Sequence, residues 1–192
     1  MADVTFDQGY FDAMYRANPD PWEFRSSQYE QSKYAATLAA LPGPRYAHAL
    51  ELGCSIGELT CQLATRVDRL TAVDTSAVAL TLARTACQSF PHVEFVQAHL
   101  PGGNWARHAD LVLLSEILYY LDEASVRLVA RQLRDAAPDA DMVLVHWTGE
   151  TNYPMTGDDA TAAFLDELSP TRVESFRAPA YRLDVIRGST PA

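Results

Sequence analysis

The sequence has few cysteines and few basic residues, and both shortages limit what the chain can be. Its three cysteines, Cys54, Cys61 and Cys87, form no CxxC pair and lack zinc-site spacing, so we expect free thiols in a reducing compartment and no structural metal. Lys and Arg number 15 against 25 Asp and Glu, a formal net charge of −10. Because phosphate binding needs a basic face, this charge argues against nucleic acid as a partner.

Long apolar stretches are also missing. The longest, near LVLLSEILYYL, is interrupted by Ser115 and Glu116 and is too short to span a bilayer. The opening MADVTFDQGY has neither a basic segment nor an apolar core, so we expect no signal peptide. We therefore expect a cytoplasmic protein without membrane contact, and nothing in the sequence calls for an obligate protein partner.

From residue 46 onward, short apolar segments alternate with helical patterns. The expected strands are 46–52, 69–74, 92–98, 109–115 and 140–147, and the helices between them are 57–67, 76–90 and 122–137. Apolar strands separated by helices are typical of a parallel sheet covered on both faces. The expected fold is therefore α/β, with a doubly wound, mostly parallel, Rossmann-like sheet.

The C-terminal part should complete this sheet. Residues 171–178 and 181–188 are separated by a short connection and are expected to form two antiparallel strands. A helix is expected before them, over 156–168. Its acidic residues, 158–159 and 166–167, are typical of a solvated helix face, so we expect no divalent metal site there.

The first 45 residues differ in character from the rest. They are rich in aromatic residues, and two prolines precede an expected helix over 26–41. Since this segment comes before the first strand, it should lie across an edge or the top of the sheet. We expect one domain, residues 1–192, in which 1–45 form a helical cap and 46–192 form the α/β core.

The stretch ALELGCSIGELT, residues 49–60, has three interpretations. Its GCSIG matches the G-x-S-x-G turn that carries the nucleophile of serine hydrolases. It also resembles a dinucleotide-binding loop in which Ser55 replaces the second glycine and would crowd a pyrophosphate. The third interpretation is the first loop of an S-adenosylmethionine (SAM) site, which holds no phosphate and needs no such clearance.

The hydrolase interpretation fits the rest of the chain poorly. In α/β-hydrolases the nucleophile turn follows several strands, whereas Ser55 follows the first expected strand, and LPGPRYAHA upstream is no HGGG-type oxyanion loop. Ser55, Asp122 and His146 do occur in the order of a triad. Order alone is a weak signal in a chain with five histidines and 25 acidic residues.

Two acidic residues favour the SAM interpretation. Glu51 ends the first strand and can face the α-ammonium group, while Gly53 allows a ligand to approach the backbone closely. Asp74 ends the second strand, 74 − 53 = 21 positions after Gly53. An acid at that place accepts hydrogen bonds from both ribose hydroxyls in nucleoside sites of doubly wound sheets.

Several stretches together carry a family resemblance. DPW at 20–22, ALELGC with Gly57, RLTAVD, PHVEFV and above all SEILYYL at 115–121 resemble the class I SAM-dependent methyltransferases, and more closely the NodS family of nodulation N-methyltransferases. The resemblance implies SAM as cofactor, S-adenosylhomocysteine (SAH) as product, and N-methylation of an amine on a saccharide-like acceptor such as a deacetylated chitooligosaccharide. It departs from the class pattern at His99, where an acid usually meets adenine, and at PDADM, which replaces a Pro-Gly-Gly turn.

Site residues follow from the motifs and the resemblance. For catalysis we expect Glu116 near the transferred methyl, His146 as general base because of its intrinsic pKa, and Tyr119. Tyr120 and Trp147 are expected to contact the acceptor. The expected cofactor-binding residues are Trp22, Tyr29, Lys33, Glu51, Gly53, Cys54, Ser55, Gly57, Asp74, Thr75, Ala98, His99, Leu100, Ser115 and Glu116.

One residue has a specific expected role, and two alternative functions remain for the chain. Lys33 lies four residues after Tyr29, on the same helix face, from which it can reach the SAM carboxylate. An O-methyltransferase for a sugar or another small molecule, and a non-catalytic SAM-binding protein, both stay open beside the N-methyltransferase.

Overall fold

The computed structural model describes residues 6–188, apart from residue 104 and residues 106–107. The first five residues belong to the opening segment in which we expect no signal peptide, and they lie outside the described residues. Within the described part of the chain, no helix is long and apolar enough to cross a membrane.

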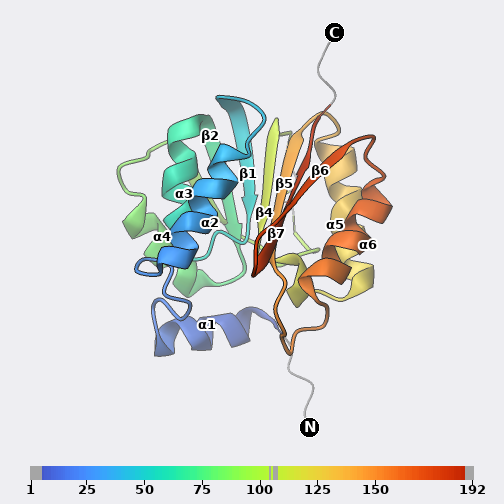
Figure 1. Cartoon of the computed structure of the whole chain (residues 1–192). Helices are drawn as coiled ribbons and strands as arrows, with labels where there is room; N and C mark the ends of the chain where they lie inside the picture. The colour runs from blue at the N-terminus through green and yellow to red at the C-terminus, as the bar shows by residue number, and fades with distance from the viewer. Residues whose placement is uncertain (1–5, 104, 106–107, 189–192) are drawn as a thin grey trace.

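A seven-stranded sheet forms the centre of the molecule (Figure 1). Its order is β3–β2–β1–β4–β5–β7–β6, in which the first five strands are parallel and the last two are antiparallel. The expected doubly wound sheet with an antiparallel end is confirmed. The strand bounds are β1 Tyr46–Leu52, β2 Val67–Asp74, β3 Val93–Gln97, β4 Leu111–Ser115, β5 Asp141–Trp147, β6 Val173–Arg177 and β7 Tyr181–Ile186.

Helices cover both faces of this sheet (Figure 1). Helices α2 (Gln28–Ala39), α3 (Glu58–Leu63) and α4 (Ala77–Ala86) lie on one side, and α5 (Glu123–Ala136) and α6 (Gly157–Leu168) lie on the other. The middle strands are therefore buried on both faces along most of their length, which explains the apolar sequence LVLL of β4 and the burial of the last four residues of β1. Four of these helices begin at a side-chain cap that accepts a backbone N–H: Ser27, Ser76, Asp122 and Thr156.

Helix α1 (Gln8–Ala17) was not expected from the sequence and lies across the carboxyl ends of the strands, at the bottom of Figure 1. The Tyr15 hydroxyl lies 2.6 Å from Ser55 Oγ, in the loop after β1. The Asp12 carboxylate accepts a 2.6 Å hydrogen bond from Ser76, which follows β2. These contacts hold the N-terminal segment over the end of the sheet where α/β folds bind ligands.

The element bounds differ from the expected ones mainly after β1. The expected helix over 57–67 ends as α3 at Leu63, continues as the 3₁₀ turn η1 (Ala64–Arg66) and gives way to β2 at Val67. A second 3₁₀ turn, η2 (Leu118–Tyr120), lies within SEILYYL, where we expected no separate element. The first difference falls at the end of a helix, which local sequence patterns define poorly, and the second is a single short turn between β4 and α5.

The expectation of three free thiols is wrong. Cys61 and Cys87 form a disulfide with a Cα–Cα distance of 5.3 Å, and Cys54 is the free, buried thiol. The bond joins α3 to the residue that ends α4, two helices that pack against each other although the cysteines are 26 residues apart. Spacing in the sequence does not show this proximity. A disulfide is also unusual in a reducing compartment, so the cytoplasmic location stays a prediction without structural support.

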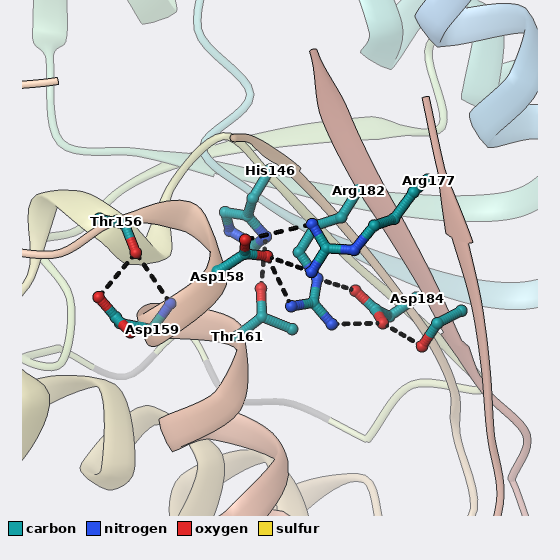
Figure 2. A network of polar contacts seen from close by, with 9 residues as sticks. His146, Thr156, Asp158, Asp159, Thr161, Arg177, Arg182 and Asp184 are labelled. Atoms are coloured by element: carbon teal, nitrogen blue, oxygen red, sulfur yellow. Dashed lines mark hydrogen bonds and ion pairs between the residues drawn. The ribbon is translucent and has the colours of Figure 1, made fainter. Parts of the chain in front are cut away.

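Polar contacts fix α6 to the strands β6 and β7 (Figure 2). Arg182 donates to both carboxylate oxygens of Asp184 and to Asp158 Oδ1, while Arg177 donates to both oxygens of Asp158. Asp184 is fully buried, so its ion pair with Arg182 is well shielded from solvent. Asp158, expected on a solvated face, is thus half of a link between a helix and the sheet.

Candidate functional site

A cavity of about 470 Å³ lies between the carboxyl ends of the parallel strands and the N-terminal helices. It is formed by α1, α2 and the start of α3, by the loops after β1, β2, β3 and β4, and by the segment after β5. All of the predicted site residues except Gly57 and His146 line it: Trp22, Tyr29, Lys33, Glu51, Gly53, Cys54, Ser55, Asp74, Thr75, Ala98, His99, Leu100, Ser115, Glu116, Tyr119, Tyr120 and Trp147. The structure therefore brings these residues together, and their individual roles stay predictions.

The end of β1 and the loop after it supply a buried acid and a tightly fitted glycine. Glu51 is 1% exposed, and its Oε2 atom has no hydrogen-bond partner among the described residues. Burial raises the pKa of Glu51 to about 7. Gly53 has φ +84°, and a Cβ there would lie 3.2 Å from Ile117 Cβ and 3.3 Å from Ser115 O. A glycine is thus required for both backbone conformation and space.

Gly57 has a packing role just outside the cavity. It adopts φ +88° immediately before α3, and a Cβ on it would lie 3.0 Å from Ala83 Cα. This close approach lets the end of the loop rest directly on α4. Gly57 therefore shapes the loop without lining the cavity.

Asp74 holds two loops in place from the end of β2. Its Oδ2 atom accepts a 2.8 Å hydrogen bond from the Ser55 backbone N–H, and Oδ1 accepts one of the same length from Ser76. Each carboxylate oxygen has two lone pairs, so both can still accept from a ligand. Burial raises the pKa of Asp74, while the hydrogen bonds to Ser76 and Ser55 oppose that rise.

The loop after β3 forms another wall of the cavity. The backbone N–H of Ala98 donates to Asp74 O, so this loop begins in contact with the end of β2. His99 is exposed, and its Nδ1 atom lies 3.4 Å from the Thr75 hydroxyl. Leu100 next to it is buried. The histidine is therefore available to a flat group placed against this wall, and nothing else in the described residues holds it.

Glu116 follows β4 and presents a carboxylate with three donors. Its Oε1 accepts from Lys33 Nζ at 2.6 Å, and Oε2 accepts from the Tyr119 hydroxyl at 2.7 Å and from the Trp147 backbone N–H at 2.8 Å. Burial acts to raise the pKa of Glu116, but the Lys33 ammonium, His146 and the Tyr119 hydroxyl together outweigh it and hold that pKa below its usual value. The residue has φ +56°, a conformation that costs a non-glycine residue about 1–3 kcal/mol.

Lys33 pairs with two protein carboxylates. Besides Glu116, its Nζ atom lies 3.0 Å from Glu30 Oε1 and 2.9 Å from Glu30 Oε2. Burial acts to lower the pKa of Lys33, but the two carboxylates outweigh it and raise the pKa. Glu30 was not predicted as a site residue. Its position three residues before Lys33 on one helix was the available signal.

His146 lies outside the cavity, in the core on the other side of Glu116. It is fully buried, its Nε2 atom accepts from the Leu118 backbone N–H at 3.3 Å, and its Nδ1 atom lies 3.4 Å from Thr161 Oγ1 (Figure 2). Burial lowers the pKa of His146 to about 4, so the imidazole is neutral at physiological pH. The structure thus separates His146 from the place where the sequence put a general base, and gives it a structural position under η2.

Aromatic residues from η2, from the segment after β5 and from the N-terminal segment form one wall of the cavity. Tyr119 and Tyr153 stack with ring centroids 5.2 Å apart, and Tyr120 packs on Tyr153 at 4.4 Å. Phe6 and Phe11 from the N-terminal segment pack on Tyr120. Sequence reasoning missed Phe11, Tyr15, Tyr34 and Tyr153 as lining residues, although the aromatic content of the first 45 residues was a signal for three of them.

Ser55 does not have the surroundings of a hydrolase nucleophile. Its Oγ atom is hydrogen-bonded to the Tyr15 hydroxyl at 2.6 Å, and His146 forms its contacts with Leu118 and Thr161 instead. Among the residues that the structure describes, no histidine bonds to Ser55. In that same part of the chain, no group of three or more His, Cys, Asp or Glu side chains is arranged to hold a metal ion.

The chain is similar to proteins of one family. The family model described as Nodulation protein S (NodS) matches residues 13–143. Nodulation protein S of Bradyrhizobium diazoefficiens is 32% identical over 130 residues, which are 65% of this chain and 61% of that protein. The match thus spans less than two thirds of this relative's length.

Two solved structures are similar to the whole fold. A Pseudomonas syringae protein provisionally described as a methyltransferase has a TM-score of 0.74 and 36% identity, and the match covers 84% of this chain and 99% of that one. The N-methyltransferase NodS from Bradyrhizobium japonicum WM9, in complex with SAH, has a TM-score of 0.80 at 21% identity, covering 96% and 100%. Both likenesses agree with the Rossmann-like fold of class I methyltransferases.

Proposed function

Because the chain belongs to the NodS family, we propose that it is a SAM-dependent methyltransferase that methylates a free amine of a saccharide-like acceptor. The observation that carries this proposal is the position of Glu116. Its carboxylate lies at the end of β4, lines the cavity and has a pKa held below the usual value by Lys33. An anion at that place suits an acceptor whose nitrogen becomes positively charged.

The cavity has groups that suit the α-ammonium group, the ribose and the adenine of SAM. The unpartnered Oε2 of Glu51 suits the α-ammonium group, and both oxygens of Asp74 have lone pairs left for the ribose hydroxyls. Gly53 leaves room for the ligand beside β4, and His99 can lie against the adenine. When bound, SAM supplies a methyl group on a sulfonium, which an aligned nucleophile can displace.

The charge of the cavity favours an amine over an anionic acceptor. Its lining includes six carboxylate residues against one lysine, and Lys33 is already paired with two of the six: Glu30, Glu51, Glu58, Asp74, Glu116 and Glu150. A carboxylate or phosphate acceptor would meet repulsion here, whereas an ammonium would be attracted. Aromatic rings of Tyr153 and Trp147 offer apolar faces to a sugar ring.

Glu116 has a definite task in such a reaction. The amine must arrive with its lone pair free; as the N–C bond forms, the S–C bond breaks with its electrons going to sulfur, and positive charge develops on nitrogen. A carboxylate that accepts an N–H bond orients the lone pair and offsets that charge. The excess proton then leaves the methylated nitrogen for solvent.

An acceptor screen tests the proposal. Wild-type protein and Glu116→Gln are incubated with SAM and amino-sugar oligomers, and SAH formation is measured. We expect turnover by the wild type, and a loss of about 100-fold or more in Glu116→Gln with SAH affinity retained. SAH binding without methylation of any amine would instead favour the non-catalytic SAM-binding protein, and turnover on N-acetylated oligomers alone would favour O-methylation.

A further inference from the structure

Lys33 is the only lysine in the 192-residue chain. It is also one of the most buried charged residues, with 2% of its surface exposed, and it sits on α2 above the end of β4. Lysine is a residue that normally stays in solvent, and a fully buried one is almost always paired. A single lysine used in this position calls for a specific explanation.

The charges around Lys33 do not leave it free for a ligand. Its ammonium lies 2.6 Å from Glu116 Oε1 and within 3.0 Å of both oxygens of Glu30. These three groups together carry one excess negative charge. The expected contact of Lys33 with the SAM carboxylate would have to break one of two buried ion pairs, which costs more than an exposed pair would.

The other titratable groups around this cluster come from every element packed on it. They are Tyr29 and Tyr34 on α2, Tyr119 on η2, His146 on β5, Glu51 on β1 and Tyr181 on β7. The Lys33 ammonium also lies 5.2 Å from the centre of the Tyr29 ring. Burial raises the pKa of Tyr29 to about 12 and lowers that of His146 to about 4, so neither carries charge near neutral pH. Among the residues that the structure describes, Lys33 is therefore the one cation paired with Glu116.

The contacts of Glu116 show what Lys33 does to it. Tyr119 and the Trp147 backbone both donate to Oε2, and Lys33 donates to Oε1. Donors on both oxygens prevent rotation of the carboxylate. The Glu116 side chain is 17% exposed, and that surface faces the cavity. One oxygen with a remaining lone pair is thus presented to a ligand in a fixed direction.

We propose that Lys33 and Glu30 are positioning residues for methyl transfer: Glu30 fixes the Lys33 ammonium, and Lys33 fixes the Glu116 carboxylate as the anion that receives the acceptor amine. This inference rests on the proposed function and states which residues maintain the negative charge that binds the acceptor. Without Lys33, the buried Glu116 carboxylate would have only neutral hydrogen-bond donors. Its pKa would then be higher, so it would take up a proton more readily. Glu116 would then lose its attraction for the amine at a higher pH.

The test compares Lys33→Met, Lys33→Arg and Glu30→Gln with the wild type. Arg131→Met on α5 is the control, because Arg131 is a half-exposed cation paired with Glu167 at the surface, away from the cavity. For each protein, kcat and the acceptor KM are measured from pH 5 to 9, and SAH affinity by calorimetry. We expect Lys33→Met to lower kcat/KM about tenfold or more, with its acid limb moved to higher pH, and SAH affinity to stay within about twofold.

The other variants set the direction of the effect. Lys33→Arg should restore part of the activity because it keeps the charge, and Glu30→Gln should cause a smaller loss than Lys33→Met. Unchanged kcat/KM and an unchanged pH profile in Lys33→Met would overturn the inference. So would a loss of SAH affinity with an unchanged acceptor KM, since it would make Lys33 a cofactor ligand.

A second measurement does not depend on whether Lys33 variants fold. Labelling with 15Nζ-lysine gives one side-chain resonance in the wild-type protein, because the chain has one lysine. We expect the pKa of this ammonium to lie above the usual lysine value of about 10.4, and we expect Glu116→Gln to lower that pKa. An unshifted titration in both proteins would contradict the pairing. If the wild type methylated none of the amines, the proposed function would be refuted instead. The two results therefore distinguish a failure of the Lys33 inference from a failure of the proposed function.

Discussion

The Asp74 carboxylate accepts a 2.8 Å hydrogen bond from the backbone N–H of Ser55 and so ties the end of β2 to the loop after β1. The same carboxylate accepts from Ser76 at the start of α4. One side chain therefore fixes two loops that border the cavity and has lone pairs left for a ligand.

Replacing Asp74 tests whether this acid binds the nucleoside. We expect Asp74→Asn to weaken SAH binding by about 1–3 kcal/mol, because the amide offers one acceptor where the carboxylate offers two charged ones. Calorimetric titration gives the affinity, and thermal unfolding shows whether the loops stay intact. SAH affinity equal to that of the wild type in a folded variant would remove Asp74 from the cofactor site.

Glu51 predicts a pH dependence of SAH binding. Burial raises the pKa of Glu51 to about 7, and only its carboxylate form attracts the α-ammonium group of the ligand. Since the ionised fraction grows as pH rises through 7, the affinity should increase about tenfold between pH 6 and 8. Glu51→Gln should bind SAH more weakly and with a flat profile over this range.

Glu51 also affects the stability of the unliganded protein, but this effect decreases with rising pH, whereas the SAH affinity increases. A pKa higher in the folded than in the unfolded state means that the folded protein binds the proton more tightly. The contribution of Glu51 to the free energy of unfolding is therefore full below about pH 4.5 and declines as pH rises through 7. The difference in this free energy between wild type and Glu51→Gln, followed against pH by urea unfolding, should show that decline.

His146 is expected to support the fold and not to exchange protons with the acceptor. His146→Ala leaves the Leu118 N–H without its acceptor, so we expect a loss of stability of about 1–3 kcal/mol or more and retained SAH binding. Burial lowers the pKa of His146 to about 4, so its stabilisation is present above about pH 6.5 and lost as pH falls toward 4. A stably folded His146→Gln with turnover reduced about 100-fold would restore the general-base role that the sequence suggested.

Reduction of the Cys61–Cys87 disulfide should destabilise the protein. The bond closes a loop with a sequence separation of 26 residues, for which chain entropy predicts about 3.5 kcal/mol. We expect dithiothreitol to lower the Tm of the wild type and to leave the Tm of Cys61→Ala/Cys87→Ala unchanged. Equal Tm values with and without reductant in the wild type would indicate that the bond contributes nothing to stability.

The sheet was predictable because each strand is a short apolar run between helical patterns, and the order β1 to β5 follows from doubly wound topology. Helix α1 was not predictable in the same way. Its sequence QGYFDAMYRA lacks a long apolar stripe, and it is held by single contacts such as Tyr15 with Ser55, 40 residues away. Tertiary contacts of this kind are invisible to a local pattern.

The sequence predicted which residues line the cavity better than it predicted which of them pair with one another. Motifs placed Glu51, Asp74 and Glu116 at strand ends, and all three line the cavity. One of the two carboxylate partners of Lys33, Glu116, is 83 residues away, and no local pattern indicates that pairing. His146 was misplaced because side chains alternate along a strand, and it follows Met142 and Leu144 of β5 into the buried core.

The central claim is transfer of a methyl group to nitrogen. The most direct measurement uses SAM labelled with 13C in its methyl group, a chitooligosaccharide with one deacetylated residue, and NMR of the product. We predict the label as an N-methyl group on the deacetylated residue alone, with no product from the fully acetylated oligomer. Label on a hydroxyl oxygen, or no transfer by a protein that binds SAH, would contradict the account.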